Sequence, residues 1–255
     1  MPSSTSATNS KGTQIFFEEN THKYFTKNDP KKEIVYTSVT SYVSTFFKPF
    51  DAEAVANKIA KSRNTTPEAL LKEWADISKE ACVYGTRVHE CCEDTLRGRS
   101  LRCVPQNEKE QKVFINAMDI ARKLKQRFDI VGIEKLIFDE ELRLAGTIDL
   151  LLKSKTAKDT YIICDWKTNK EINTESKYGE HALYPIESLD DCETSHYGLQ
   201  LGLYSHILKS GGYIPNNSIV KKAIVHITQT GSDIITLDGY DQYVDLILKF
   251  KNGNI

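Results

Sequence analysis

The chain lacks any apolar run long enough to cross a membrane and lacks an excess of charge of either sign. A spanning helix needs about 20 consecutive apolar residues, and none of the 255-residue sequence reads that way. The formal net charge is −1, so no global basic field indicates a large non-specific nucleic-acid binder. The first residues lack the apolar core of a secretory signal and the arginines of a transit peptide. We therefore expect an intracellular protein with no membrane partner.

Cysteine pairs with metal-cluster spacing are also missing. No CxxC pair occurs, and no cysteine follows Cys192. In a protein expected inside the cell, disulfides are rare and free buried thiols are the better interpretation. The six cysteines are Cys82, Cys91, Cys92, Cys103, Cys164 and Cys192.

The residues that are present predict one elaborated globular domain. The apolar fraction of 40% and the charged fraction of 27% are ordinary for such a chain. Residues 1–12 are polar and are expected to form a disordered tail. Residues 13–80 are expected to form an N-terminal hairpin and helical region, and residues 81–255 a core that packs with it as one compact domain.

Apolar periodicity and capping residues predict the elements of both regions. In the N-terminal region we expect a hairpin over 14–18 and 22–26, and helices over 39–47, 51–62 and about 67–96, capped by Ser38, Asp51 and Thr66. In the core we expect a helix over 107–128, strands over 131–139, 142–153 and 160–166, a helix over 194–209, strands over 219–229 and 232–237, and a closing helix over 240–250. This order of helix, three strands, helix and strand predicts an α/β fold with a helical N-terminal addition.

Two acidic residues interrupt apolar strands of this core. Asp165 and Lys167 alternate with Trp166, so they should leave the third strand on one face. That segment alone is explained equally well by an Asp–Lys ion pair. Asp149 lies in the preceding strand, and a hairpin would bring the two carboxylates together, with a repulsion of roughly 4 kcal/mol at 4 Å and an effective dielectric of 20. Since Mg²⁺ and Mn²⁺ prefer oxygen ligands, a shared divalent cation would turn this repulsion into a site.

Four motifs, spread over about residues 80–210, resemble those of RecB-like PD-(D/E)XK nucleases. They are AGTID ending at Asp149, ICDWKT around Asp165, YGTRVHE with its GxxxH pattern ending at His89, and YGLQLGLY with its QxxxY pattern from Gln200 to Tyr204. The resemblance implies the restriction-endonuclease-like αβββαβ core of that family, a mixed central sheet flanked by helices. The chain resembles the mitochondrial genome maintenance exonuclease, to which it is similar in size, as well as CRISPR-associated RecB-like exonucleases without their iron–sulfur cluster and stand-alone nucleases of phages and large DNA viruses.

The resemblance also implies roles for individual residues. Asp149, Asp165 and Lys167 would be catalytic. The metal ligands would be His89, Asp149, Asp165 and the backbone carbonyl of Trp166, with Glu134 as a further candidate whose alternative is a solvated edge residue. Candidate substrate contacts are Gln200, Tyr204, Thr168, Arg87 and Tyr178. A lone helical histidine such as His89 would otherwise be read as a packing residue.

The activity implied is Mg²⁺- or Mn²⁺-dependent cleavage of phosphodiester bonds. The leading hypothesis is a DNA exonuclease that prefers single-stranded ends and acts in replication, recombination or repair. The alternatives are a structure-specific or RNA-cutting endonuclease, a nucleic-acid-binding subunit with a vestigial site, and a chance match in an unrelated α/β binding protein. The cysteines do not reproduce the layout that holds an iron–sulfur cluster in several relatives, so no cluster is predicted.

The polar stretch between Lys170 and Thr194 is too long for an ordinary turn. It follows the strand of Lys167 and should lie at the rim of the site. One hypothesis is a gate whose Tyr178, His181 and Tyr184 stack on bases. The alternative is an ordered surface loop.

Overall fold

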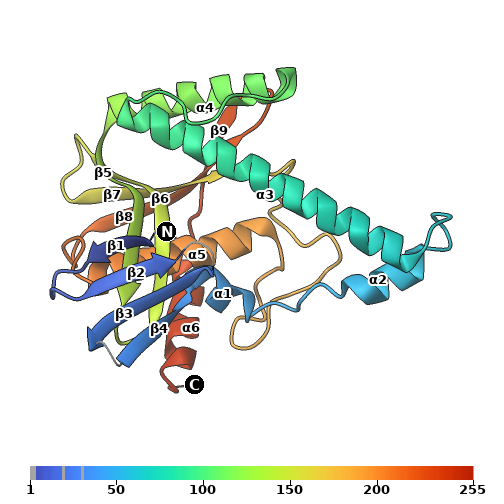
Figure 1. Cartoon of the computed structure of the whole chain (residues 1–255). Coiled ribbons are helices and arrows are strands. Elements are labelled where there is room, and N and C mark those ends of the chain that lie inside the picture. Colours follow the sequence, from blue (N-terminus) through green and yellow to red (C-terminus); the bar gives the residue numbers. More distant parts are fainter. Residues whose placement is uncertain (1–3, 19–20, 30–31, 255) are drawn as a thin grey trace.

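The computed structural model describes residues 4–18, 21–29 and 32–254, and within them nine strands form one mixed sheet. Figure 1 shows α3 and α4 on one side of the core strands and α5 on the other. The core strands are β5 (Phe128–Asp139), β6 (Leu144–Ser154), β7 (Thr160–Lys167), β8 (Ile219–Ile227) and β9 (Ser232–Thr236). β5, β6 and β7 pair antiparallel, β7 and β8 pair parallel, and β8 and β9 pair antiparallel. Together with the helices that flank them, these strands confirm the predicted fold class.

The predicted capping residues begin the helices. Thr66 accepts a hydrogen bond from the Ala69 N–H at 3.2 Å, Pro67 follows it, and Gly98 ends the helix with φ at +69°. The helices are α1 (Val39–Ser44), α2 (Ala52–Ile59), α3 (Pro67–Arg97), α4 (Glu108–Arg127), α5 (Glu193–Ser210) and α6 (Asp241–Lys251). In the part of the chain that is described, none of them has both the length and the apolarity that a membrane crossing requires.

Side chains of the central strands pack into two apolar clusters, one on each face of the sheet. Along β7, Cys164 and Trp166 pack in the cluster with α3 and α4, while Ile163 packs in the cluster with α5. Because strand side chains alternate, Asp165 and Lys167 leave β7 on the α5 side. Four cysteines are buried as predicted, whereas Cys82 is exposed and Cys103 is half-buried.

The N-terminal region differs from the prediction in two respects. The disordered tail is wrong for residues 4–8, because β1 (Ser4–Thr8) pairs antiparallel with β2 (Gln14–Glu18); residues 1–3 lie outside the described residues. Asn9 continues the attachment by donating to Glu140 Oε1 at 2.7 Å. A strand at the edge of a sheet needs few apolar residues, which explains why its polar sequence resembled a tail.

The N-terminal addition is also not purely helical. The predicted hairpin of β2 and β3 (Lys23–Asp29) is confirmed, and β4 (Lys32–Ser38) extends it. β4 then joins the core through a short parallel pairing, Thr37 with Leu144 and Ser38 with Ala145. This strand was missed because its apolar run is short and its last residue, Ser38, is also the cap of α1.

The pairing of β6 creates a fork in the sheet. β5 pairs with β6 from Leu144 to Ser154 at every position except Asp149, so one edge of β6 is largely occupied. β4 and β7 must share the other edge, where β4 pairs with residues 144–145 and β7 with residues 150–153. Residues 146–149 lie between these two pairings. On this edge, residues 146–149, which end at Asp149, pair with no other strand of the described chain.

Candidate active site

The fork brings the two predicted acids together. Leu150 pairs with Cys164, so one further step of the antiparallel register places Asp149 opposite Asp165. Both carboxylates are buried, with 9% and 5% of the residue exposed. Asp149 Oδ2 accepts a hydrogen bond from the Trp166 N–H at 2.9 Å, which ties the two strands together at this point.

A third acid and a histidine complete a candidate ligand set. His89 of α3, Glu134 of β5 and Asp149 each offer a ligand atom, and these atoms lie within 4.8 Å of one another. Glu134 adopts a φ of +51°, a left-handed conformation that costs a non-glycine residue of order 1–3 kcal/mol. The group thus contains the candidate that the sequence ranked lowest among the ligands.

Burial, together with neighbouring negative charge, raises the pKa values of these acids. Burial, followed by the charge of Asp149, raises the pKa of Glu134 to about 8. Burial, followed by the charge of Asp165, raises the pKa of Asp149 to about 6. A divalent cation would offset this repulsion, and two carboxylates with one imidazole form a donor set that Mg²⁺ or Mn²⁺ accepts. The residues present therefore fit the metal that the resemblance implies.

The imidazole of His89 has a defined orientation. Its Nε2 lies 3.0 Å from the carbonyl oxygen of Trp166, and because a carbonyl only accepts, Nε2 must carry the proton. Its Nδ1 lies 3.5 Å from Asp149 Oδ2. The ring thus turns its Nδ1 toward the acids. The predicted ligand role of the Trp166 carbonyl stays a prediction, since this oxygen accepts the His89 proton here.

Asp165 makes different contacts from Asp149. Its carboxylate forms an ion pair with Lys167, and its Oδ1 accepts from Gln200 Nε2 at 3.2 Å. Burial opposes the charge on Lys167, but the charges of Asp165 and Asp149 outweigh it and raise the pKa of the lysine. Asp165 lies outside the three-residue ligand group found among the described residues, so its role as a ligand also stays a prediction.

Tyr204 fills the inside of the fork. Its residue is only 4% exposed, and its hydroxyl lies 3.4 Å from Gln200 Nε2. A Cβ atom on Gly146 would lie 2.5 Å from its ring, which explains why the AGTID segment has glycine there. Burial raises the pKa of Tyr204 well above its usual value. This tyrosine supports the site from within, and the half-buried Gln200 links it to Asp165.

The remaining predicted substrate contacts are not gathered at the acids. Thr168 lies 3.6 Å from the Cβ position of Gly85 and lines a cavity of about 610 Å³ beside α3. Arg87 instead forms an ion pair with Glu110 at 3.0 Å, and only 13% of its side chain is exposed. Tyr178 is 86% exposed. The structure therefore separates Arg87 from the acids and leaves Tyr178 at a rim.

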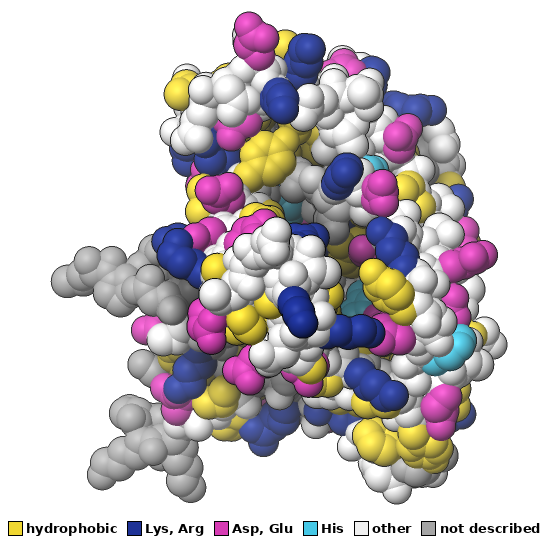
Figure 2. All heavy atoms as spheres, turned by 90° about the vertical axis from the view of Figure 1, so that its right-hand side faces the viewer, with side chains coloured by type: hydrophobic (Ala, Val, Ile, Leu, Met, Phe, Trp, Pro, Cys, Tyr) yellow, Lys and Arg dark blue, Asp and Glu magenta, His cyan; other side chains and the backbone are white. Residues whose placement is uncertain are grey.

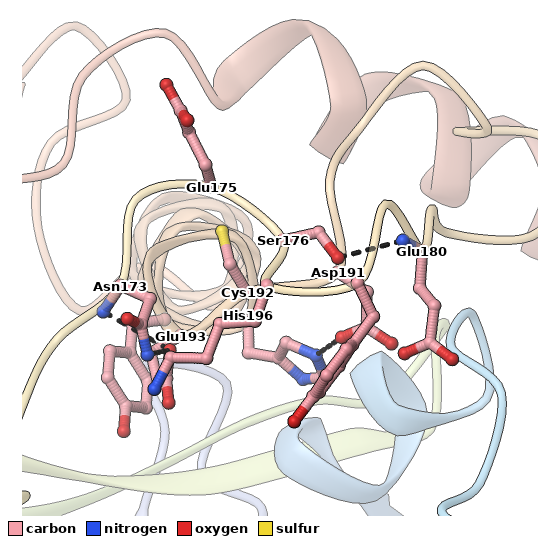
Figure 3. Close-up of a pocket in the computed structure, with 11 residues that line it drawn as sticks. Asn173, Glu175, Ser176, Glu180, Asp191, Cys192, Glu193 and His196 are labelled. Carbon is pink, nitrogen blue, oxygen red and sulfur yellow. Dashed lines mark hydrogen bonds and ion pairs between the residues drawn. The ribbon is translucent and has the colours of Figure 1, made fainter.

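The polar segment before α5 forms a second cavity, of about 440 Å³ (Figure 3). Figure 3 shows His196 directed toward Asp191, with Nε2 and Oδ1 2.8 Å apart. Tyr178 lines this cavity, whereas Tyr184 packs edge-on against Phe250 with centroids 6.0 Å apart. His181 is 3.2 Å from Asp190. Of the three gate candidates, Tyr178 is the one that lines this cavity.

Sequence reasoning missed Tyr197. The Lys167 ammonium lies over its ring, and its hydroxyl accepts from Asn169 Nδ2 at 3.1 Å. Tyr197 also lines the cavity in Figure 3. The signal was present, because Tyr197 precedes Gln200 by three residues and therefore lies on the same helix face.

A comparison with protein families agrees with this geometry. The model of the PD-(D/E)XK nuclease superfamily matches residues 54–236, which is more than half of the chain. The chain therefore belongs to the PD-(D/E)XK nuclease superfamily, whose members use divalent metals to cut nucleic acids. A comparison with curated proteins gave no match.

Proposed function

We propose that this protein is a Mg²⁺- or Mn²⁺-dependent DNA exonuclease that acts on single-stranded ends, inside the cell, in replication, recombination or repair. The observation that carries the proposal is the convergence of His89, Glu134 and Asp149 beside the Asp165–Lys167 ion pair. A fold gains no stability from burying acids whose charges repel each other, so this arrangement points to chemistry.

Each residue has a role that its contacts support. His89, Glu134 and Asp149 would hold the metal, which supplies a hydroxide near neutral pH and offsets charge that develops on the phosphate. Lys167 is a compact cation that can approach a phosphate oxygen or the attacking water. Asp165 and Gln200 hold Lys167 in place through one connected set of polar contacts.

The surroundings of the site suit a single strand. A cavity of about 560 Å³ is lined by His89, Glu134 and Thr147, and a cavity of about 610 Å³ is lined by Thr168 and Lys170. Both are bounded by α3. Positive and negative side chains are intermixed on the face in Figure 2. We therefore expect binding to depend on a few local contacts, with a shallow dependence on salt.

An end-labelled digestion panel tests the proposal. Linear single strand, duplex and circular single strand are incubated with Mg²⁺ or Mn²⁺, and linear single strand should be shortened fastest while the circle stays intact. Asp149→Asn and Lys167→Met should abolish cleavage, and Lys221→Met, an exposed lysine on β8, should not. Cleavage of the circle would identify an endonuclease. No cleavage of any DNA or RNA substrate would favour the vestigial binding subunit.

A further inference from the structure

An aromatic pair from the N-terminal sheet lies at the candidate metal site. Phe17 of β2 stacks on Tyr24 of β3, with ring centroids 4.5 Å apart and an interplanar angle of 27°. Both residues line the cavity of about 560 Å³ that also holds His89 and Glu134. In Figure 1 these two strands lie below α3, the helix that carries His89. The N-terminal sheet therefore contributes a wall to the cavity of the catalytic core.

The position of this pair is fixed by the core. Tyr24 is 8% exposed and belongs to an apolar cluster with Leu136 and Ala145 of β5 and β6. Its hydroxyl lies 3.5 Å from Thr147 Oγ1, two positions before Asp149 on β6. Phe17 packs at the margin of this cluster and is only half-buried. Tyr24 thus anchors the pair, and Phe17 is the more exposed of the two rings that line the cavity.

The cavity is also lined by two arginines and by the acids Glu90 and Glu93. Arg97 and Arg102 line it, with 40% and 44% of their side chains exposed, and both form ion pairs with Glu93. The cavity therefore combines an aromatic wall, guanidinium groups and candidate metal ligands. A nucleotide presents the matching chemistry, since it has a flat base and a phosphate.

We infer that Phe17, supported by Tyr24, is a stacking platform for the base of a nucleotide next to the phosphate that is cut. The inference rests on the proposed function and names the substrate contact of that site. A base can stack on Phe17 only when its face is free, which is the case at an unpaired end but not inside a duplex. The N-terminal sheet would thereby contribute to the preference for single strands. His22, with its ring centroid 5.9 Å from that of Phe17, extends the aromatic row at the hairpin.

The same hairpin supplies a matched control. Phe16 is adjacent to Phe17 and also stacks on an aromatic ring, that of Phe25, at 5.6 Å and 21°. Because strand side chains alternate, Phe16 leaves β2 on the opposite face. Phe16→Ala therefore removes an equally large stacked ring from the same strand without touching the cavity of His89.

The test is a double-mutant cycle in which the ring of Phe17 and one base of the DNA are removed singly and together, and binding is measured each time. Binding of a fluorescein-labelled single strand is measured by anisotropy in Ca²⁺, so that cleavage is not the readout, and each of the terminal nucleotides is replaced in turn by an abasic one. With the unaltered protein, one abasic position should weaken binding about 5- to 150-fold, the range for one stacked base. Phe17→Ala should weaken binding of the intact strand by a similar factor, and the abasic position should then have no further effect.

Two further variants keep the result interpretable. Phe17→Trp should retain binding. Phe17→Leu keeps apolar volume without the ring and should weaken binding, so it replaces Phe17→Ala as the test if the alanine variant does not fold. Equal losses for Phe16→Ala and Phe17→Ala, an abasic effect that persists in Phe17→Ala, or no single-strand binding by the unaltered protein would each overturn the inference. Failure of the digestion panel with an intact double-mutant cycle would refute the proposed cleavage but leave the stacking contact in place.

Discussion

The Lys167 ammonium lies over the ring of Tyr197, 4.6 Å from its centroid. The two residues come from β7 and α5, and only 18% of the lysine side chain is exposed. A cation–π contact contributes about 0.5–1 kcal/mol at an exposed site and about 2 kcal/mol or more when it is desolvated. Together with Asp165, this ring determines where the positive charge of Lys167 is held.

Tyr197 is therefore expected to be a positioning residue. Tyr197→Leu should lower kcat about tenfold, equivalent to about 1.4 kcal/mol, with little change in KM because the lysine acts on the reacting phosphate. Tyr197→Phe keeps the ring, loses only the contact with Asn169, and should retain most of the activity. Steady-state kinetics on a single-stranded oligonucleotide measure both. Equal losses in the two variants would show that the hydroxyl, and not the ring, is what matters.

The raised pKa of Glu134 predicts how the stability of the metal-free protein depends on pH. The folded-state pKa of Glu134, about 8, lies above its usual value, so between roughly pH 4.5 and 8 the folded state holds more protons than the unfolded state. The contribution of Glu134 to the free energy of unfolding should therefore be complete below about pH 4.5 and be lost as the pH rises to about 8. Melting temperatures in EDTA should fall over this interval.

A comparison of two variants isolates the cause of this decline. Glu134→Gln should flatten the dependence, because the amide does not titrate. Asp129→Asn changes an exposed acid of the same strand and should leave the curve unchanged. Identical curves for Glu134→Gln and the unaltered protein would mean that the surroundings of Glu134 do not raise its pKa.

Metal should stabilise the protein through the same acids. A ligand at a hundredfold excess over its Kd adds about 2.7 kcal/mol, which for a chain of this size corresponds to roughly 5–11 °C in Tm. Asp149→Asn should lose most of this shift with Mn²⁺. Differential scanning fluorimetry at pH 7.5 measures it, and a full shift in the variant would place the ion elsewhere.

Two glycines of the motifs should respond differently to alanine. Gly146→Ala places a Cβ 2.5 Å from the buried ring of Tyr204, and overpacking of this kind costs about 1–3 kcal/mol. Gly85→Ala meets Thr168 Oγ1 at 3.6 Å, an ordinary contact, and should stabilise α3 by up to about 1 kcal/mol. Urea unfolding measures both free energies. Similar destabilisation in the two variants would contradict the steric argument.

The segment before α5 should affect the choice of substrate. Tyr178→Ala removes an exposed ring from the rim of the 440 Å³ cavity and should change the ratio of single-strand to duplex cleavage. Tyr184→Ala removes a ring that packs on Phe250 and should change stability but not this ratio. If Tyr178→Ala slowed both substrates by the same factor, the segment would be a surface loop with no gating role.

Local signals predicted most of the fold. Capping residues such as Thr66, and the change of apolar period after residue 128, identified the helices and core strands because these signals depend on near neighbours. Strand β4 and the attachment of residues 4–8 depend on pairing with distant segments, which no local pattern encodes. The prediction that Asp149 and Asp165 come together followed from the presence of one acid in each of two apolar strands.

Sequence patterns identified some residues of the candidate site but not others. Asp149, Asp165 and Lys167 could be named because an acid in an apolar strand is unusual, and His89 because of its motif. Glu134 was given the lowest rank among the candidate ligands, because its left-handed backbone and its proximity to His89 and Asp149 are visible only in three dimensions. Arg87 was named for its charge, yet Glu110 lies 23 residues away in sequence and forms an ion pair with it.

The two-residue pairing of β4 with β6 has a consequence for how the chain can be divided. The pairing of Thr37 and Ser38 with β6 makes strands β1 to β4 part of the same sheet as Asp149. A shortened version starting at α1 would leave the edge of β6 beside the fork open to solvent and to pairing with other chains. The blue strands of Figure 1 are thus not a detachable module.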